Sequence, residues 1–409
     1  MPNETKLWQY VKDVAVKTCE KFGFGEIIIP TFETKELFMR STAESSFIVQ
    51  KEMFSFKDLK NREFFLRPEG TLPTARAIVE HGFLNKTPPI KIFYIINSFR
   101  NERPQEGRYK EFYQFGVELF GSKEAISEFE VISLAEMFFK EIGISNLKLE
   151  INSIGCSNCR KGFVEKLKDY FEKHSNKMCE DCQRRLNTNP LRILDCKNLN
   201  CKEISKNSPK ILDFICEDCL KHFEDVLKLL KFNNIKHEIN PTLVRGLDYY
   251  TRTVFEFTTE NLGAQNTVCG GGRYDDLLET LGANPTPALG FGVGLNRLIL
   301  LIKKEKEELI KEKCDIYIGS LNEEAILKIS KIANNLRKQN LIVQTDLLNR
   351  TVKSQMKYAN KINSSFSCII GEDELTNNKV NIKNMFSKEI FNVSLNNFEE
   401  EFINIFKKI

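Results

Sequence analysis

The chain has 409 residues, of which 41% are hydrophobic and 28% are charged, and its formal net charge is +4. This composition is typical of a globular protein with its own core and excludes a disordered or fibrous chain, while the length predicts two or three domains. The N-terminus lacks a basic-then-apolar signal pattern, and no run of 18 apolar residues occurs. We therefore expect a cytoplasmic protein with no membrane span, whose mild positive charge permits a nucleic-acid partner without requiring one.

The first elements predicted along the chain are a helix and an interrupted strand. Residues 4–22 have apolar residues at helical spacing, and Gly23 follows the last of them. The apolar run EIIIPTFETKELF contains Pro30, which cannot donate to a ladder, so this strand should lie at an edge or an interface. Residues 62–120 are strand-rich, and two strands flank the polar loop NERPQEGRYK in a long hairpin. A helix is predicted over residues 125–142.

Residues 155–235 interrupt this pattern, because they hold eight of the twelve cysteines and many lysines. Strands resume at residue 243 and continue to a helix after Gly294. From Asp315, strands alternate with helices, one of which has Ile326, Ile329 and Leu336 on one face, as in a small α/β domain. The predicted fold is an α+β catalytic domain on a mostly antiparallel sheet (1–154 and 236–312), interrupted by a cysteine-rich helical module (155–235) and followed by an α/β domain (315–409).

The hairpin carries the first candidate site. Its loop brings together Arg100, Arg103 and Arg108, and an arginine pairs bidentately with phosphate. On the return strand one face carries an aromatic, an amide and a carboxylate: Phe112, Gln114 and Glu118. These groups suit a nucleotide beside an ammonium-bearing ligand; the alternative is a solvated charged hairpin.

Three further segments are individually weak signals. GFGVGLNRL (290–298) alternates glycines along one strand face, which would let a flat ligand such as adenine lie close, and Arg297 follows at a helix start. CGGGRYDDL (269–277) has three glycines that fit either a site or a tight turn. LRPEGT (66–71) supplies Arg67, Glu69 and Thr71; its acidic residue and hydroxyl could grip an amine, or the turn is only a helix N-terminal arrangement.

The segment LVRGLDYYTRTVFEF (243–257) begins with polar, planar residues and continues as an alternating strand. We expect Arg245, Tyr249 and Tyr250 to line a pocket for a small amino acid whose carboxylate is activated. The alternative is a strand start with a buried tyrosine pair.

Together these segments resemble the bacterial-type histidyl-tRNA synthetases, a family of class II aminoacyl-tRNA synthetases. IIIPTFE resembles the first motif of that class, FRNERPQEGRYKEFYQFGVELFG the second and GFGVGLNRL the third. RGLDYYT and CGGGRYD resemble two stretches peculiar to the histidine-specific members. The resemblance covers nearly the whole chain, although the arginine-glycine-threonine segment that usually precedes the first helix is absent before PNETKLWQY.

The resemblance implies a role for each matching residue. Arg100 and Arg245 would be catalytic, both acting at the ATP α-phosphate. The implied ATP-binding residues are Arg100, Glu102, Arg108, Phe112 and Arg297. The implied histidine-binding residues are Glu69, Gly70, Thr71, Gln114, Glu118, Tyr249 and Tyr250. Within that set the two tyrosines would read the imidazole, whereas Glu69, Thr71, Gln114 and Glu118 would lie around the α-amino group and carboxylate.

The resemblance also implies the reaction, that of a histidine–tRNA ligase. L-Histidine and ATP would form histidyl-adenylate with Mg²⁺, and the acyl group would pass to the 3′ end of tRNA(His). A carboxylate that is ionised at pH 7 needs no general base for the first step, only alignment and neutralisation of phosphate charge. A homodimer with Pro30 near its interface is implied, as are contacts of residues 155–235 with the tRNA acceptor stem and of the last domain with the anticodon.

Two other functions remain open at this stage. One is a regulatory subunit of ATP phosphoribosyltransferase, which shares the catalytic fold and senses histidine; the arginines at 100, 108 and 297 and the last domain argue against it. The other is a zinc-dependent nucleic-acid-binding protein, which leaves about four-fifths of the chain unexplained.

The cysteines of residues 155–235 are candidate metal ligands, because paired CxxC spacing is typical of tetrahedral zinc sites in a cytosolic chain. Eight thiolates suffice for two four-cysteine sites, and the alternative is reduced, partly buried thiols. The candidates are Cys156, Cys159, Cys179, Cys182, Cys196, Cys201, Cys216 and Cys219.

Overall fold

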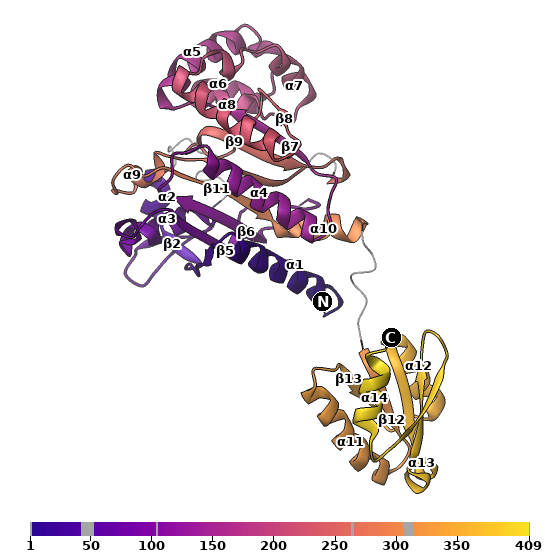
Figure 1. Ribbon diagram of the computed structural model, residues 1–409. Helices are drawn as coiled ribbons and strands as arrows, with labels where there is room; N and C mark the ends of the chain where they lie inside the picture. Colours follow the sequence, from indigo (N-terminus) through magenta and orange to yellow (C-terminus); the bar gives the residue numbers. More distant parts are fainter. Residues whose placement is uncertain (1, 42–52, 104, 263–265, 306–313, 409) are drawn as a thin grey trace. The chain divides into compact units, whose positions relative to one another are not determined.

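The computed structural model describes residues 2–41, 53–103, 105–262, 266–305 and 314–408 (Figure 1). The chain divides into two compact units, Leu7–Glu307 and a second unit that combines Glu308–Ile409 with Met1–Lys6. The predicted boundary at residue 312 lies outside the described residues. Among the helices that are described, none is both long and apolar enough to cross a membrane.

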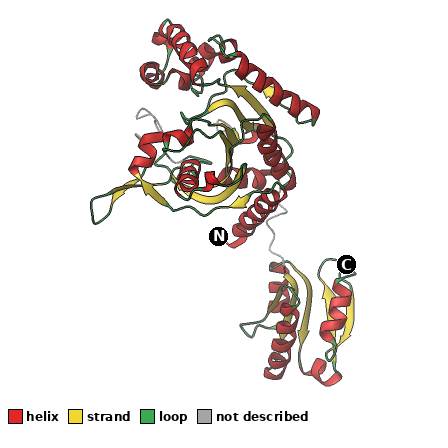
Figure 2. Ribbon diagram, turned by 60° about the vertical axis from the view of Figure 1, so that its left-hand side comes forward, coloured by secondary structure: helices red, strands yellow, loops and turns green. Residues whose placement is uncertain are grey.

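The larger unit is built on an eight-stranded sheet. Its strands are antiparallel except for β1 with β5 and β7 with β8, so the predicted mostly antiparallel sheet is confirmed. Figure 2 shows the curved sheet in yellow with red helices beside it. In spatial order the strands are β1 (Gly25–Glu26), β5 (Ile90–Phe99), β6 (Glu111–Phe120), β11 (Ala288–Gly294), β10 (Thr267–Arg273), β9 (Thr251–Thr258), β7 (Lys148–Ser153) and β8 (Glu238–Ile239).

Helices cover this sheet because each has one apolar face. Helix α4 (Ile126–Glu141) buries Val131, Leu134 and Phe138 against β6, β10 and β11, close to the predicted span 125–142. The helix predicted over residues 4–22 is present as α1, which ends at Lys21. The remaining helices around the sheet are α1 (Pro2–Lys21), α2 (Lys35–Ser41), α3 (Thr71–Glu80), α9 (Leu277–Thr280) and α10 (Leu295–Glu305).

The region around Pro30 differs from the single strand expected there. The chain forms β1 at the edge of the large sheet, breaks at Pro30, and continues as β2 (Phe32–Thr34) in a separate sheet with β4 (Glu63–Leu66) and β3 (Ser55–Lys57). The break has a physical cause, because the Arg67 guanidinium binds the carbonyl oxygens of Ile29 at 2.6 Å and Pro30 at 2.7 Å. Arg67 is thus a structural residue.

The cysteine-rich segment forms four α-helices between β7 and β8, at the top of Figure 1. Its apolar residues Phe163, Leu167 and Phe171 are fully buried in the same core cluster as Tyr249 and Tyr250 of the large unit. The segment therefore packs directly on the rest of the large unit. Its helices are α5 (Ser157–Glu172), α6 (Glu180–Thr188), α7 (Leu199–Lys206) and α8 (Glu217–Phe232).

The second unit has the predicted strand–helix–strand order and a five-stranded mixed sheet. Helix α11 (Glu323–Lys338) buries Ile329 and Leu336 as expected, but Ile326 is exposed and Ala325 is buried in its place. The strands are β13 (Val343–Thr345), β12 (Cys314–Ser320), β14 (Ser364–Ile370), β15 (Lys379–Asn384) and β16 (Ile390–Ser394), and the other helices are α12 (Val352–Lys361), α13 (Glu372–Asn377) and α14 (Phe398–Phe406).

Candidate active site

A hollow of about 190 Å³ lies over the middle of the large sheet. It brings together three arginines that the sequence separates by almost 200 residues, Arg100, Arg245 and Arg297. Two predicted site residues, Gly70 and Glu118, do not line the hollow, but Glu118 lies directly behind it and accepts a hydrogen bond of 2.7 Å from Thr71. The predicted residues that line it are Glu69, Thr71, Arg100, Glu102, Arg108, Phe112, Gln114, Arg245, Tyr249, Tyr250 and Arg297.

At one end of the hollow the hairpin β5–β6 positions a cluster of charges. Arg100 donates from Nε to the carbonyl oxygen of Pro68 at 2.9 Å, and its guanidinium lies 5.2 Å from the centre of the Phe112 ring. The Glu102 carboxylate lies 2.7 Å from Arg108 and 3.8 Å from Arg100. One carboxylate between two arginines leaves this end with net positive charge, which suits an anionic ligand.

Arg297, on the first turn of α10, joins the hairpin loop to the sheet. It donates from Nε to the Gly107 carbonyl oxygen at 3.2 Å and from Nη1 to that of Thr267 at 3.0 Å. Burial, and then repulsion from Arg108, lowers the pKa of Arg297. Repulsion between these cations means that a phosphate chain placed between them would be strongly stabilised.

Arg245 lies on the loop before β9 and faces the middle of the hollow. Its guanidinium pairs with Glu256 and lies 5.6 Å from the centre of the Tyr250 ring. Burial disfavours its charged form, but the Glu256 carboxylate outweighs burial and raises the pKa of Arg245. Its Nε has no hydrogen-bond partner, and neither has the Oε1 atom of Gln114, among the residues that the structure describes. Two unpartnered polar atoms in one hollow indicate a polar ligand.

The other end of the hollow is aromatic. The rings of Tyr249, Tyr250 and Tyr274 pack with centroid separations of 4.9 to 6.2 Å. Beneath them Glu118 accepts hydrogen bonds from the hydroxyls of Tyr274 and, at 3.0 Å, Tyr94. Burial raises the pKa of Glu118 to about 8, so this carboxyl holds a proton at neutral pH.

Glycines on the neighbouring strands provide the space for these side chains. A Cβ atom on Gly290 would lie 2.1 Å from Glu118 Oε2, and one on Gly292 would lie 2.3 Å from Gln114 Nε2. A Cβ on Gly270 would lie 2.3 Å from the Arg245 guanidinium. The alternating glycines therefore accommodate side chains of the site, besides leaving bare backbone toward the hollow.

The segment LRPEGT forms the helix N-terminal arrangement considered for it and also lines the hollow. The Glu69 carboxylate accepts hydrogen bonds from the backbone N–H groups of Thr71 at 2.6 Å and Leu72 at 2.9 Å, which lie in the first turn of α3. The same residue is buried and lines the hollow. Burial raises the pKa of Glu69 despite these bonds.

Several residues of the site were not assigned from the sequence. Tyr274 lies in the segment CGGGRYD, and no role was predicted for it, although it contacts both tyrosines and Glu118. Glu256, the partner of Arg245, lies at an alternate position of β9 and gave no signal of its own. Asn296 lines the hollow and accepts a hydrogen bond of 2.7 Å from the Tyr113 N–H, which joins α10 to β6.

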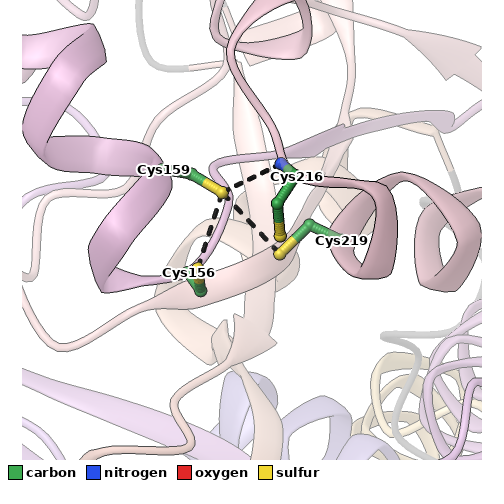
Figure 3. A group of neighbouring side chains, drawn as sticks. All are labelled: Cys156, Cys159, Cys216 and Cys219. Atoms are coloured by element: carbon green, nitrogen blue, oxygen red, sulfur yellow. Dashed lines mark hydrogen bonds between the residues drawn. The ribbon is translucent and has the colours of Figure 1, made fainter.

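The eight predicted metal-ligand cysteines gather into two groups, away from the hollow. Cys156, Cys159, Cys216 and Cys219 form one group, called the root cluster here because it lies where the module leaves the sheet (Figure 3). Cys179, Cys182, Cys196 and Cys201 form the other, the distal cluster. Within each group the four sulfur atoms lie within 4.8 Å of one another.

Comparison with known proteins gives consistent matches. The family model for histidyl-tRNA synthetase matches residues 1–298, and the model for an anticodon-binding domain matches residues 315–405. A histidine–tRNA ligase of Clostridium novyi (strain NT) is 47% identical over 98% of this chain and 95% of its own length. One from Caldanaerobacter subterraneus subsp. tengcongensis is 44% identical over 98% and 96%. Apo histidyl-tRNA synthetase of S. aureus matches with a TM-score of 0.81 and 34% identity, covering 98% of this chain and 97% of that one.

The curved antiparallel sheet, the arginine-bearing hairpin and the separate last domain define a class II aminoacyl-tRNA synthetase. This class consists of ligases that join an amino acid to tRNA. Within it, the chain belongs to the histidyl-tRNA synthetase family.

Proposed function

We propose that this chain activates L-histidine with ATP and transfers it to the 3′ end of tRNA(His), and that the hollow over the sheet performs the first step. The proposal rests on one observation: Arg100, Arg245 and Arg297 line the same hollow as Tyr249 and Tyr250. The end of the hollow that the tyrosines line is called the recess. The cations at one end of the hollow suit the triphosphate of ATP, and the polar aromatic rings at the other end suit the imidazole of histidine. The reacting atoms would then lie between the two ends.

In the first step a histidine carboxylate oxygen attacks the α-phosphorus of ATP. A new P–O bond forms between the carboxylate oxygen and the α-phosphorus as the bond from the α-phosphorus to the bridging oxygen breaks, and pyrophosphate leaves with that electron pair. The side chains near the centre supply position and charge: Arg245 and Arg100 neutralise the α-phosphate as negative charge spreads over it. Glu256 holds Arg245 in place through an ion pair, so little reorganisation is needed on reaction.

The recess selects the amino acid. Glu69 and Gln114 line the hollow near Arg100 and suit the α-ammonium and carboxylate groups. The resemblance places Glu118 with them, but its bonds to Tyr94 and Tyr274 favour the imidazole end. A site that hydrogen-bonds both ring nitrogens rejects other amino acids strongly, because it would leave its own buried polar groups unpaired.

The nucleotide end would hold ATP between the hairpin loop and α10. Phe112 offers a ring face for adenine, while Arg108 and Arg297 suit the β- and γ-phosphates. Mg²⁺ at such sites binds mainly phosphate and water oxygens with one or two carboxylates, so Glu102, which lines the hollow between two arginines, fits as its protein ligand. The ion would supply neutralisation of phosphate charge.

The eight cysteines would hold zinc, one ion in each cluster, because four sulfur atoms within reach of one another suit a structural Zn²⁺. The module's lysines suit contact with the acceptor stem of tRNA. In the second unit Lys353, Lys357 and Lys361 lie exposed along α12, which suits contact with RNA phosphates near the anticodon.

Pairing into a homodimer would use the surface beside β1. Ile28 is 89% exposed, and Phe32 and Phe56 on the small sheet are 48% and 41% exposed. Phe32 and Phe56 come from the two outer strands of the small sheet, with ring centroids 5.6 Å apart, and exposed apolar side chains that gather in this way are typical of an interface between subunits.

The test is ATP–pyrophosphate exchange with each of the twenty amino acids, followed by charging of tRNA(His). We expect exchange with histidine alone and transfer of the acyl group to tRNA. Histidine binding without exchange would instead support the regulatory-subunit alternative, and exchange driven by another amino acid would refute the assignment of the recess.

A further inference from the structure

The sulfur positions of both clusters match a tetrahedral metal site. The Sγ–Sγ distances are 3.5 Å for Cys156 and Cys159, 4.0 Å for Cys159 and Cys219, and 3.8 Å for Cys179 and Cys196. A regular tetrahedron with zinc–sulfur bonds of about 2.3 Å has edges of about 3.8 Å. These separations are nearly twice an S–S bond of about 2.05 Å, so the clusters are arranged for a metal ion and not for disulfides.

The backbone around the clusters also favours metal-bound thiolates. Cys156, Cys179 and Cys216 each occupy the N-cap position of a helix, where the helix dipole favours negative charge. In addition the Cys216 N–H donates to Cys159 Sγ at 3.1 Å, and the Cys179 N–H donates to Cys201 Sγ at 3.3 Å. Such N–H···S bonds orient the sulfur atoms and stabilise their charge.

The root cluster touches the segment that forms the histidine end of the hollow. Arg160, which directly follows the ligand Cys159, donates to the carbonyl oxygen of Tyr250 at 2.8 Å. Gly155, which directly precedes Cys156, accepts a hydrogen bond of 2.9 Å from the N–H of Arg252. The first pair of ligands is therefore linked through adjacent residues to both sides of Thr251.

The second pair of ligands is linked to the same segment. Asp218, between Cys216 and Cys219, forms an ion pair with the Arg252 side chain. Arg252 has a φ of 49°, in the left-handed region that a residue with a side chain seldom adopts. Contacts from both halves of the root cluster thus hold a strained residue two positions from Tyr250.

Helix α8 makes a second connection from the root cluster to the site. His222, one turn after Cys219, lies 2.6 Å from the buried Glu128 carboxylate. Glu128 in turn pairs at 2.6 Å with Arg273, which is fully buried. Arg273 is next in sequence to Tyr274, the residue that donates to Glu118 in the histidine recess.

The distal cluster has fewer polar contacts with this segment, although Cys182, Cys196 and Cys201 belong to the same buried apolar cluster as Tyr249 and Tyr250. Asn189 donates a hydrogen bond of 2.6 Å to Asp248, which lies on the loop before β9. Asn189 is not adjacent to a ligand of this cluster, because it is seven residues from both Cys182 and Cys196. The residues next to its ligands make no hydrogen bond or ion pair with residues 245–252 among the interactions of the described chain.

We propose that both clusters bind Zn²⁺ and that the zinc of the root cluster is a positioning site for histidine recognition, whereas the zinc of the distal cluster stabilises the module alone. The role in recognition rests on the proposed function of the hollow. Loss of the root zinc frees Arg160 and Asp218, so that the segment 249–252 relaxes and the tyrosines no longer match the imidazole. The nucleotide end, held by the hairpin and α10, stays in place.

The test combines metal content with the affinities for the two substrates. The full chain is purified without chelators, and zinc is measured by mass spectrometry, with two ions per chain expected. Cys216→Ser and Cys179→Ser are matched changes, one in each cluster and both at a helix N-cap, and each should reduce the content to one ion. Only Cys216→Ser should raise the KM for histidine, on the order of 10-fold, with the KM for ATP unchanged.

Arg160→Ala separates the positioning role from the folding of the module. It should retain two zinc ions and still raise the KM for histidine, and Arg160→Lys should restore part of the affinity. Active protein without zinc, equal effects of the two serine variants, or an unchanged histidine KM in Arg160→Ala would overturn the proposal. If the wild-type chain exchanges no pyrophosphate, the function of the hollow fails, and calorimetric binding of histidine then replaces KM in the same comparison.

Discussion

Replacing Gly270 by alanine tests whether the position of Arg245 determines the rate of adenylate formation. The new Cβ would lie 2.3 Å from the Arg245 guanidinium, and ordinary contact begins at 3.4 Å, so the guanidinium must move by roughly 1 Å. A displacement of about 1 Å at a reacting centre costs about 100-fold in rate, equivalent to about 2.7 kcal/mol in the barrier. Histidine-dependent ATP–pyrophosphate exchange in Gly270→Ala should therefore fall about 100-fold in kcat.

Two comparisons make this prediction specific. Gly162→Ala places a methyl group on α5 with no atom within 4 Å, and it should leave exchange unchanged. In the Arg245→Ala background, which should itself nearly abolish exchange while histidine still binds, Gly270→Ala should add almost nothing. Additive losses in the double variant, or normal exchange in Gly270→Ala alone, would refute the reasoning.

The remaining predictions concern pH, assembly and the nucleotide. Because burial raises the pKa of Glu118 to about 8, the folded state keeps a proton that the unfolded state loses above about pH 4.5. Stability should then fall as pH rises from 5 to 8, and the thermal-unfolding midpoint of Glu118→Gln should fall less; equal slopes would contradict this. Ile28→Glu with Phe32→Glu should give monomers by light scattering, whereas Phe232→Glu, at an exposed residue of the module, should not. A dimer in the double variant would show that this surface is not the interface. Arg297→Ala should raise the KM for ATP by 10-fold or more and leave the affinity for histidine by calorimetry unchanged, and a parallel loss of both would refute its assignment to the phosphates.

The strands and helices with strong periodicity were predictable from the sequence. The hairpin 90–121 pairs Ile90 with Phe120 and Phe99 with Glu111, because its hydrophobic pattern and polar loop fix the register. The break at Pro30 was only half predictable. Proline signalled an edge, but the separation into two sheets depends on Arg67, which reaches back over 37 residues to the carbonyl oxygens there.

The site shows the same division between local and long-range signals. Arg100, Arg245 and Arg297 stand in recognisable segments, so their common hollow followed from the resemblance. Tyr274 was missed because its role comes from a bond to Glu118, 156 residues away, which no local pattern reveals. The spacing of the cysteines identified the pairs, but not that Cys156 and Cys159 join the pair near residue 216 instead of the nearer pair at 179 and 182.

The central claim is that three arginines hold the phosphates of ATP beside a recess that reads imidazole. It is tested most directly by a crystal structure of the chain with histidine and a non-hydrolysable ATP analogue. The account predicts the α-phosphate within hydrogen-bond distance of Arg100 and Arg245, the γ-phosphate at Arg297, and the imidazole among the hydroxyls of the tyrosine recess. Phosphates bound away from these arginines, or histidine bound elsewhere, would contradict it.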